Sequence, residues 1–84
     1  MIVVIIPVFN EEKKIKDVVN SVKRYCDELI IVNDGSNDQT KEILESLDGI
    51  TLVNHKSNQG IGSATKTGIK KAIEIGAEYI LKFD

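Results

Sequence analysis

The 84-residue sequence has one cysteine and no long apolar run, and each shortage excludes a class of protein. With Cys26 alone, the chain forms no internal disulfide and has no second thiol for a cysteine-based metal site. The longest apolar run, residues 2–6, is too short to span a membrane or to form the apolar part of a signal peptide. We therefore expect a cytoplasmic protein with a reduced thiol.

The sequence also lacks an excess of charge of either sign. Eleven Lys and Arg residues against thirteen Asp and Glu residues give a net charge of −2 at pH 7. Proteins that attract nucleic acid or an anionic membrane surface by charge carry a basic excess. We therefore expect no nucleic-acid partner.

What the sequence does contain is enough apolar material for one small folded domain. Hydrophobic residues make up 42% of the chain and charged residues 29%, with no repeat, low-complexity stretch or linker. At this length folding hides only about 60–65% of the surface that the unfolded chain exposes. We expect residues 1–84 to form a single domain of modest stability.

Apolar periodicity predicts four strands alternating with three helices. Continuously apolar, β-branched segments are typical of strands that are covered on both faces of a parallel sheet. Between them, apolar residues recur at spacings of three and four, as in amphipathic helices. The order βαβαβαβ with short loops predicts an α/β fold, a Rossmann-like three-layer parallel sheet. The expected strands are residues 2–6, 29–32, 50–53 and 79–83.

Local residue types predict where the elements begin and end. Pro7 is expected to end the first strand. The first helix is expected to begin with Asn10 as its N-cap and Glu11 in its first turn, where the helix dipole favours a carboxylate. Ser36 and Gln39 have the spacing of a capping box at the start of the second helix.

Residues that follow the first two strands are candidates for ligand binding, because ligands of such sheets lie beyond the carboxyl ends of the strands. Pro7 supplies a rigid turn, Phe9 a ring that can lie against a base, and Glu11 a carboxylate. Asp34 can accept hydrogen bonds from a base or a ribose hydroxyl, and Gly35 lets a ligand approach the backbone. Structural roles compete with these: core packing for Phe9, the helix dipole for Glu11, and turn chemistry after the second strand.

The later strands are followed by further candidates. Residues 58–64 bring Gly60 and other small residues to a helix N-terminus, whose N–H groups either face a phosphate or pack on the sheet. The segment is no dinucleotide fingerprint, because it follows the third strand and has Thr65 at the third glycine position. Asp84 follows the last strand, where a carboxylate can bind Mg²⁺ or Mn²⁺. His55 has no partner at a catalytic spacing, so we expect it to be a solvated loop residue.

Four sequence blocks, taken in order, resemble those of family 2 glycosyltransferases. The resemblance spans the whole chain, and its specificity comes from the order of the blocks on the expected loops. The form Asn-x-Gly-x-Gly-x-Ala-x-x-Thr-Gly is similar to the branch that transfers sugars to polyprenyl (dolichyl) phosphate. The blocks are Ile-Pro-Val-Phe-Asn-Glu-Glu (6–12), Val-Asn-Asp-Gly-Ser-Asn-Asp-Gln-Thr (32–40), Asn-Gln-Gly-Ile-Gly-Ser-Ala (58–64) with Thr67-Gly68, and Phe83-Asp84.

The resemblance implies the N-terminal half of a GT-A fold, which binds a UDP- or GDP-linked sugar for inverting transfer of a hexose. Polyprenyl phosphate at the cytoplasmic face of the membrane is the implied acceptor, and Mg²⁺ or Mn²⁺ the implied metal of the full-length family. Pro7, Phe9 and Glu11 match the first nucleotide-contacting loop, and Asp34 matches the carboxylate that contacts base or ribose. We assign Lys13, Lys14, Lys16, Lys70 and Lys71 to solvated helix faces but include Lys66 among the candidate donor-binding residues. The expected donor-binding residues are Pro7, Phe9, Glu11, Asp34, Gly35, Gly60, Lys66 and Asp84.

The sequence departs from the family pattern at two places. Asn33 stands where Asp is common, which leaves Asp34 as the carboxylate directly after the second strand. Asp84 matches the first Asp of the metal-binding Asp-x-Asp motif, and the sequence ends there. The second Asp and the general base lie outside the sequence. We therefore expect an N-terminal fragment with no catalytic residue, weak metal binding and no transfer activity of its own.

These departures keep a second class open, a non-catalytic module that binds a nucleotide or completes its fold by pairing with another chain. The resemblance implies a sheet that continues past residues 79–83, which would leave the apolar side chains of that strand uncovered. We expect self-association through this strand, and expect Ile80→Lys to favour the monomer if that side chain faces the missing half. The apolar residues concerned are Tyr79, Ile80, Leu81 and Phe83.

Overall fold

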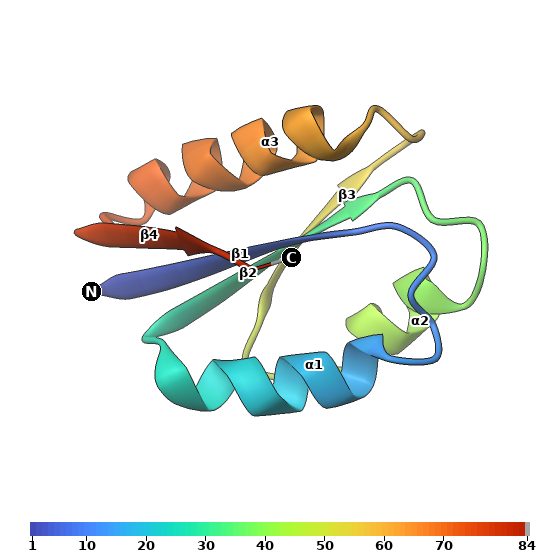
Figure 1. The fold of residues 1–84 in the computed structure, drawn as a ribbon, viewed down its shortest axis with the longest axis horizontal. Helices are drawn as coiled ribbons and strands as arrows, with labels where there is room; N and C mark the ends of the chain where they lie inside the picture. The colour runs from blue at the N-terminus through green and yellow to red at the C-terminus, as the bar shows by residue number, and fades with distance from the viewer. Residues whose placement is uncertain (84) are drawn as a thin grey trace.

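The computed structural model describes residues 1–83 as a four-stranded parallel sheet with helices on both faces (Figure 1). The strand order is β3-β2-β1-β4, so it reverses between β1 and β4. This confirms the predicted α/β class and the βαβαβαβ order. The strands are β1 (Ile2–Val8), β2 (Glu28–Asp34), β3 (Thr51–His55) and β4 (Tyr79–Lys82). The helices are α1 (Ile15–Val22), the 3₁₀ helix η1 (Lys23–Tyr25), α2 (Thr40–Glu45) and α3 (Ile61–Glu74).

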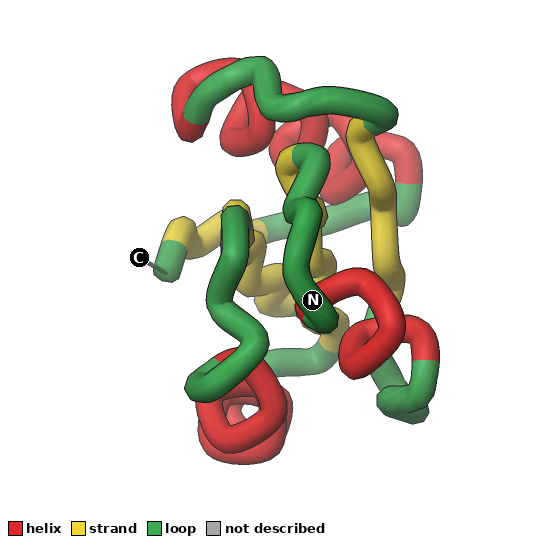
Figure 2. Tube along the Cα trace, turned by 90° about the vertical axis from the view of Figure 1, so that its right-hand side faces the viewer, coloured by secondary structure: helices red, strands yellow, loops and turns green. Residues whose placement is uncertain are grey.

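Alternation along the central strands builds a core on each face of the sheet. Val4 and Ile6 of β1 point to one face, where they pack with Ile15 of α1. Val3 and Ile5 point to the other face and pack under α3. Figure 2 shows the sheet between these helices, with α1 and α2 on one side and α3 on the other. The three-layer arrangement follows from the apolar residues on both faces of β1 and β2.

Helix α3 lies close to the sheet because its inward face carries small side chains. Ala64, Gly68 and Ala72 are its buried residues. A Cβ atom on Gly68 would lie 2.3 Å from Cγ2 of Ile5, so only glycine fits there. Ile61, the first residue of the helix, lies beyond the edge of the core and is 59% exposed.

The first two strands are longer than the sequence predicted. Pro7 does not end β1, which continues to Val8. The carbonyl of Ile5 faces β4, where it accepts a hydrogen bond from the Phe83 N–H at 2.9 Å. Because the backbone orientation repeats every two residues in a strand, the N position of Pro7 also faces the β4 side. Its missing N–H therefore removes no hydrogen bond to β2. β2 likewise extends to Asp34, which makes Asp34 a strand residue and not a turn residue.

The first helix begins later than predicted. Asn10 is not its N-cap: its φ of 51° is left-handed, and α1 starts at Ile15. The carbonyl of Glu11 accepts hydrogen bonds from the N–H groups of Lys14 (3.1 Å) and Ile15 (2.9 Å), so a separate turn precedes the helix. Glu11 therefore lies before the helix and not in its first turn.

The second helix is capped by a different residue from the one predicted. Ser36 and Gln39 form no capping box; instead Oδ1 of Asp38 accepts a hydrogen bond from the Thr40 N–H at 2.8 Å. The Ser36 hydroxyl instead accepts a hydrogen bond from the Asn10 N–H and donates one to Oδ1 of Asn33 in β2. At the end of α3, Gly76 has a φ of 87°, as expected for the glycine that stops the helix.

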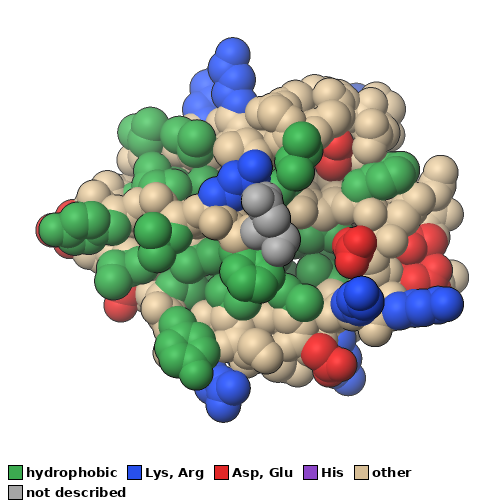
Figure 3. All heavy atoms as spheres, viewed as in Figure 1, with side chains coloured by type: hydrophobic (Ala, Val, Ile, Leu, Met, Phe, Trp, Pro, Cys, Tyr) green, Lys and Arg blue, Asp and Glu red, His purple; other side chains and the backbone are tan. Residues whose placement is uncertain are grey.

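An apolar groove of about 720 Å³ lies between α1 and the edge strand β4. Tyr79, Leu81 and Phe83 are 68%, 56% and 42% exposed, and Figure 3 shows hydrophobic side chains gathered on this face. Ile80 points the other way and packs toward α3, so the condition under which we expected Ile80→Lys to favour the monomer is not met.

None of the helices in residues 1–83 has the length and hydropathy that crossing a bilayer requires.

Candidate functional site

A pocket of about 260 Å³ opens where β1, β2 and the start of α3 meet. Of the predicted residues, it brings together Pro7, Phe9, Asp34 and Gly60, all of which line it. The pocket lies at the carboxyl ends of the strands, beside the strand where the sheet order reverses. This is the edge at which the sequence predicted a ligand site.

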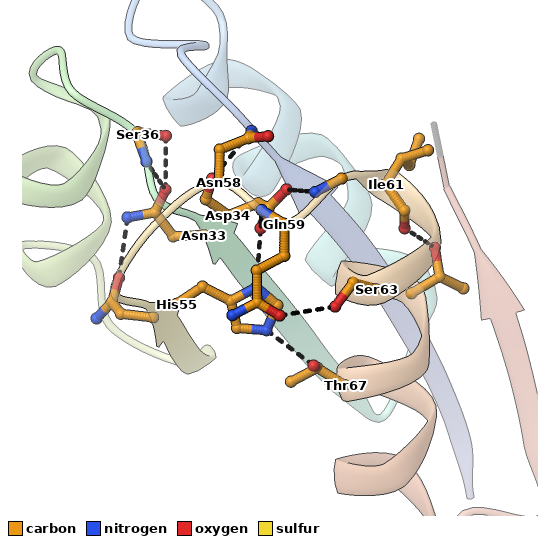
Figure 4. A network of polar contacts seen from close by, with 12 residues as sticks. Asn33, Asp34, Ser36, His55, Asn58, Gln59, Ile61, Ser63 and Thr67 are labelled. Carbon is orange, nitrogen blue, oxygen red and sulfur yellow. Dashed lines mark hydrogen bonds and ion pairs between the residues drawn. The ribbon is translucent and has the colours of Figure 1, made fainter.

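The carboxylate of Asp34 is the centre of the polar contacts at this edge. Asp34 is the last residue of β2 and only 2% exposed. Its Oδ1 accepts a hydrogen bond from the Gln59 N–H at 2.9 Å, and its Oδ2 accepts one from the Gly60 N–H at 2.8 Å (Figure 4). The His55 ring contributes a third, with Nδ1 2.8 Å from Oδ1. Asp34 therefore ties the loop between β3 and α3 to the sheet.

These contacts keep Asp34 ionised although it is buried. Burial raises the pKa of its carboxyl group, but the hydrogen bonds from Gln59, His55 and Gly60 outweigh burial and lower the pKa below its usual value. An ionised carboxylate offers about four acceptor positions, of which these donors take three. Two of these donors bind Oδ1 and one binds Oδ2, so by this count the remaining acceptor position is on Oδ2.

Two N–H groups of the loop before α3 bind the Asp34 carboxylate, so these two are not available to a phosphate. The N–H groups of Gln59 and Gly60 point at Asp34. Of the two roles that the sequence left open, facing a phosphate or packing on the sheet, these two groups have the second. Gly35 has a related role: a Cβ atom there would lie 2.3 Å from the backbone carbon of Ser57. The space that we expected Gly35 to leave for a ligand is filled by the neighbouring loop.

His55 is not the solvated loop residue that we expected. It is the last residue of β3, its side chain is 10% exposed, and it lies in register with Asp34. Its Nε2 is 2.8 Å from Oγ1 of Thr67, so the ring joins β2 to α3. The position of two polar residues at the ends of consecutive strands was the signal in the sequence that could have paired them.

The loop after β1 is attached to the loop after β2 through Ser36 and Asn33. The N–H of Asn10 donates to Oγ of Ser36 at 2.9 Å, and that hydroxyl donates to Oδ1 of Asn33 at 2.6 Å. On its other side, Nδ2 of Asn33 donates to Oδ1 of Asn54 at 2.9 Å. The side chain of an ionised aspartate at position 33 would have no N–H to donate to Asn54. The hydrogen bond to Asn54 therefore requires the asparagine that stands here in place of the aspartate common in the family.

The other predicted residues lie outside the pocket. Glu11 lies beside it and lines an adjoining surface hollow, while its N–H donates to Oγ1 of Thr40 at 2.9 Å. Lys66 is on the exposed face of α3, away from the buried stripe, and does not line the pocket. Asp84 lies outside the described residues. Phe9, by contrast, lines the pocket and is 43% exposed.

The described residues do not by themselves fit a metal centre. Within residues 1–83, no three Asp, Glu, His or Cys side chains lie close enough together to hold a cation. The pocket combines an anionic acceptor with an aromatic ring, which suits binding and orientation of a polar, planar ligand.

We expect Asp34→Asn to lower the free energy of unfolding by about 1–3 kcal/mol at pH 7, because an amide NH₂ group cannot accept the N–H bonds of the loop. The folded pKa of Asp34 is below its reference value of 3.8. The stabilisation is therefore complete above that value and is lost as the pH falls through the folded pKa. Urea unfolding between pH 7 and pH 2 should show the difference from wild type shrinking with acid.

The exposed Asp48 provides the matched control, since Asp48→Asn removes a carboxylate of the same type in the bend between α2 and β3. It should leave the free energy of unfolding nearly unchanged across the same range. A difference for Asp34→Asn that stays constant from pH 7 to pH 2 would contradict the assignment of its lowered pKa.

Comparison with known proteins identifies the family. Residues 3–83 match the family model described as Glycosyl transferase family 2. The UDP-N-acetylglucosamine–dolichyl-phosphate N-acetylglucosaminyltransferase of Methanococcus voltae is 40% identical over an alignment that covers 100% of this chain and 40% of that protein. A dolichyl-phosphate beta-glucosyltransferase of Trichomonas vaginalis is 30% identical, with 95% of this chain and 28% of that protein covered.

A third relative, the uncharacterized glycosyltransferase EpsJ of Bacillus subtilis, is 37% identical over 86% of this chain and 23% of its own length. This chain thus spans less than half the length of the curated relatives it matches. The family match covers nearly all of the sequence, including both loops of the pocket. The chain therefore belongs to glycosyl transferase family 2.

Proposed function

We propose that this chain is the donor-binding part of a glycosyltransferase and that its pocket holds the base of a UDP- or GDP-linked sugar. The observation that supports this is the pairing of an ionised, almost fully buried Asp34 with the exposed ring of Phe9 in one pocket. Uracil and guanine each carry an N–H on the edge that pairs with other bases, and the free acceptor position on Oδ2 suits such a donor. Their flat faces suit stacking on Phe9.

The activity of the longer protein is also a proposal. Two of the relatives are named as transferases that act on dolichyl phosphate. We propose an inverting transfer of a hexose from the nucleotide-sugar to a polyprenyl phosphate at the cytoplasmic face of the membrane. The general base and the second Asp of the Asp-x-Asp motif, which the resemblance implies, are not among residues 1–84. A module that only binds nucleotide would share the pocket but would not support transfer in the longer protein.

If the proposal is correct, UDP or GDP stabilises the chain, and CDP and ADP do so less. Uracil and guanine present a ring N–H where cytosine and adenine present an acceptor, which an ionised Asp34 repels. A ligand at about 100 times its Kd adds roughly 2.7 kcal/mol to the free energy of unfolding, or about 10–20 °C in Tm for a domain of this size. Thermal unfolding with each nucleotide, followed by calorimetric titration, measures both.

The matched variants are Phe9→Ala and Tyr79→Ala, two aromatic truncations at exposed positions at opposite ends of the sheet. The first should weaken binding by about tenfold or more, because base stacking contributes about 1–3 kcal/mol. The second should not change it. Adding Mn²⁺ should change the affinity little; a tight one-to-one Mn²⁺ site, or no response to any nucleotide, would contradict the proposal.

We propose in addition that the groove between α1 and β4 binds a second copy of the chain. β4 is an edge strand, and a two-fold axis can bring two such edges and their apolar faces together. The net charge of −2 per chain causes only weak electrostatic repulsion between two copies. Burial of Leu81, Phe83 and Tyr25, which line the groove, contributes about 1.5–3 kcal/mol each before the cost of association.

Sedimentation equilibrium at micromolar concentration should therefore show dimers or larger species of the isolated chain. Leu81→Lys should raise the monomer fraction, because Leu81 lines the groove and is 56% exposed. Ile80→Lys should instead lower the free energy of unfolding, since Ile80 packs toward α3. A stable wild-type monomer at high concentration would contradict self-association.

A further inference from the structure

We infer that His55 is a positioning residue for nucleotide binding, and that Thr67 acts through it. This inference rests on the proposed function, because it assigns His55 the task of holding the Asp34 carboxylate at the angle that a base requires. His55 does not itself line the pocket. Its effect on a ligand would therefore pass through Asp34.

The three side chains form a chain of contacts from a helix to the pocket (Figure 4). Thr67 is in the middle of α3, His55 ends β3, and Asp34 ends β2. The distances are 2.8 Å from Oγ1 of Thr67 to Nε2 of His55, and 2.8 Å from Nδ1 of His55 to Oδ1 of Asp34. Three elements of the fold thus converge on one carboxylate.

The chemistry of the groups fixes the direction of these hydrogen bonds. An ionised carboxylate only accepts, so the Nδ1 atom of His55 carries a proton and donates it to Asp34. In the neutral ring Nε2 is then the acceptor, and the hydroxyl of Thr67 is its donor. Thr67 therefore supports the tautomer of His55 that Asp34 requires, and it holds the far side of the ring.

His55 differs from the other two donors to Asp34 in how it is held. The N–H groups of Gln59 and Gly60 belong to a loop, whereas the His55 ring is fixed by its strand and by Thr67. A carboxylate bound only to loop donors can rotate together with the loop. The hydrogen bond from His55 to Oδ1 restrains rotation of the carboxyl group. The remaining acceptor lone pair on Oδ2 therefore keeps a fixed direction.

The inference is tested by the affinity and base selectivity of the complete chain for UDP and CDP, or for GDP and ADP. His55→Leu removes both hydrogen bonds and should weaken the preferred nucleotide by about tenfold while bringing the two bases closer in affinity. His55→Asn places an amide N–H near the position of Nδ1, so it should restore most of the affinity and selectivity. His55→Gln reaches toward Thr67 instead and should not.

A variant pair on α3 tests the contribution of the helix. Thr67→Val should lower affinity and selectivity in the same direction as His55→Leu, but less. Thr65→Val is the control, because Thr65 donates to the carbonyl of Ile61 within the same helix and does not line the pocket. Nitrogen NMR of the His55 ring should show the Nδ1–H tautomer in wild type, and in Thr67→Val a changed Nε2 signal with Nδ1 still protonated.

The possible outcomes separate the two claims. If wild type binds none of the four nucleotides, the proposed function is wrong and the inference falls with it. If wild type binds, but His55→Leu and Thr67→Val change only stability and leave the ratio of UDP to CDP (or GDP to ADP) affinity intact, the inference alone is wrong. Should His55→Leu fail to fold, the comparison of His55→Asn with His55→Gln and the Thr67 pair decides it.

Discussion

Burial of the Asp34 carboxylate is the constraint on which the rest of the pocket depends. A buried charge is costly unless donors surround it, and here two backbone N–H groups and an imidazole do so. These bonds attach the segment before α3 to the end of β2. They also fix where α3 begins, since the carbonyl of Gly60 accepts the N–H of Ala64 at 3.0 Å. One carboxylate therefore determines both a wall of the pocket and the acceptor within it.

Close packing at two glycines makes this arrangement possible. Gly35 lets the loop after β2 lie against the backbone of Ser57, and Gly68 lets α3 lie against Ile5. Without these approaches the loop donors would be too far from Asp34 to reach it. The pocket thus results from how tightly one helix and one loop pack on the sheet, and its ligand chemistry results from the charge that this packing encloses.

The sequence predicted the architecture well because apolar period and length suffice to distinguish buried strands from amphipathic helices. It predicted the edge that holds Pro7, Phe9, Asp34 and Gly60, since parallel topology places strand ends together. It missed what depends on contacts between loops: the partners of Ser36, the filled space beside Gly35, and the burial of His55. The contacts of Gly35 and His55 depend on the register of β2 with β3, and those of Ser36 on how the loop after β1 meets the loop after β2; no local pattern specifies either.

The account stands on the hydrogen bonds that Asp34 accepts from the loop, and amide hydrogen exchange of the intact chain measures them most directly. The N–H groups of Gln59 and Gly60 should exchange as slowly as amides of the adjoining strands, although both residues lie outside regular structure. Asp34→Ala, which removes both acceptor oxygens, should release both. Exchange of these two amides in wild type at the rate of an unstructured peptide would show that Asp34 does not hold the loop, and would contradict the account.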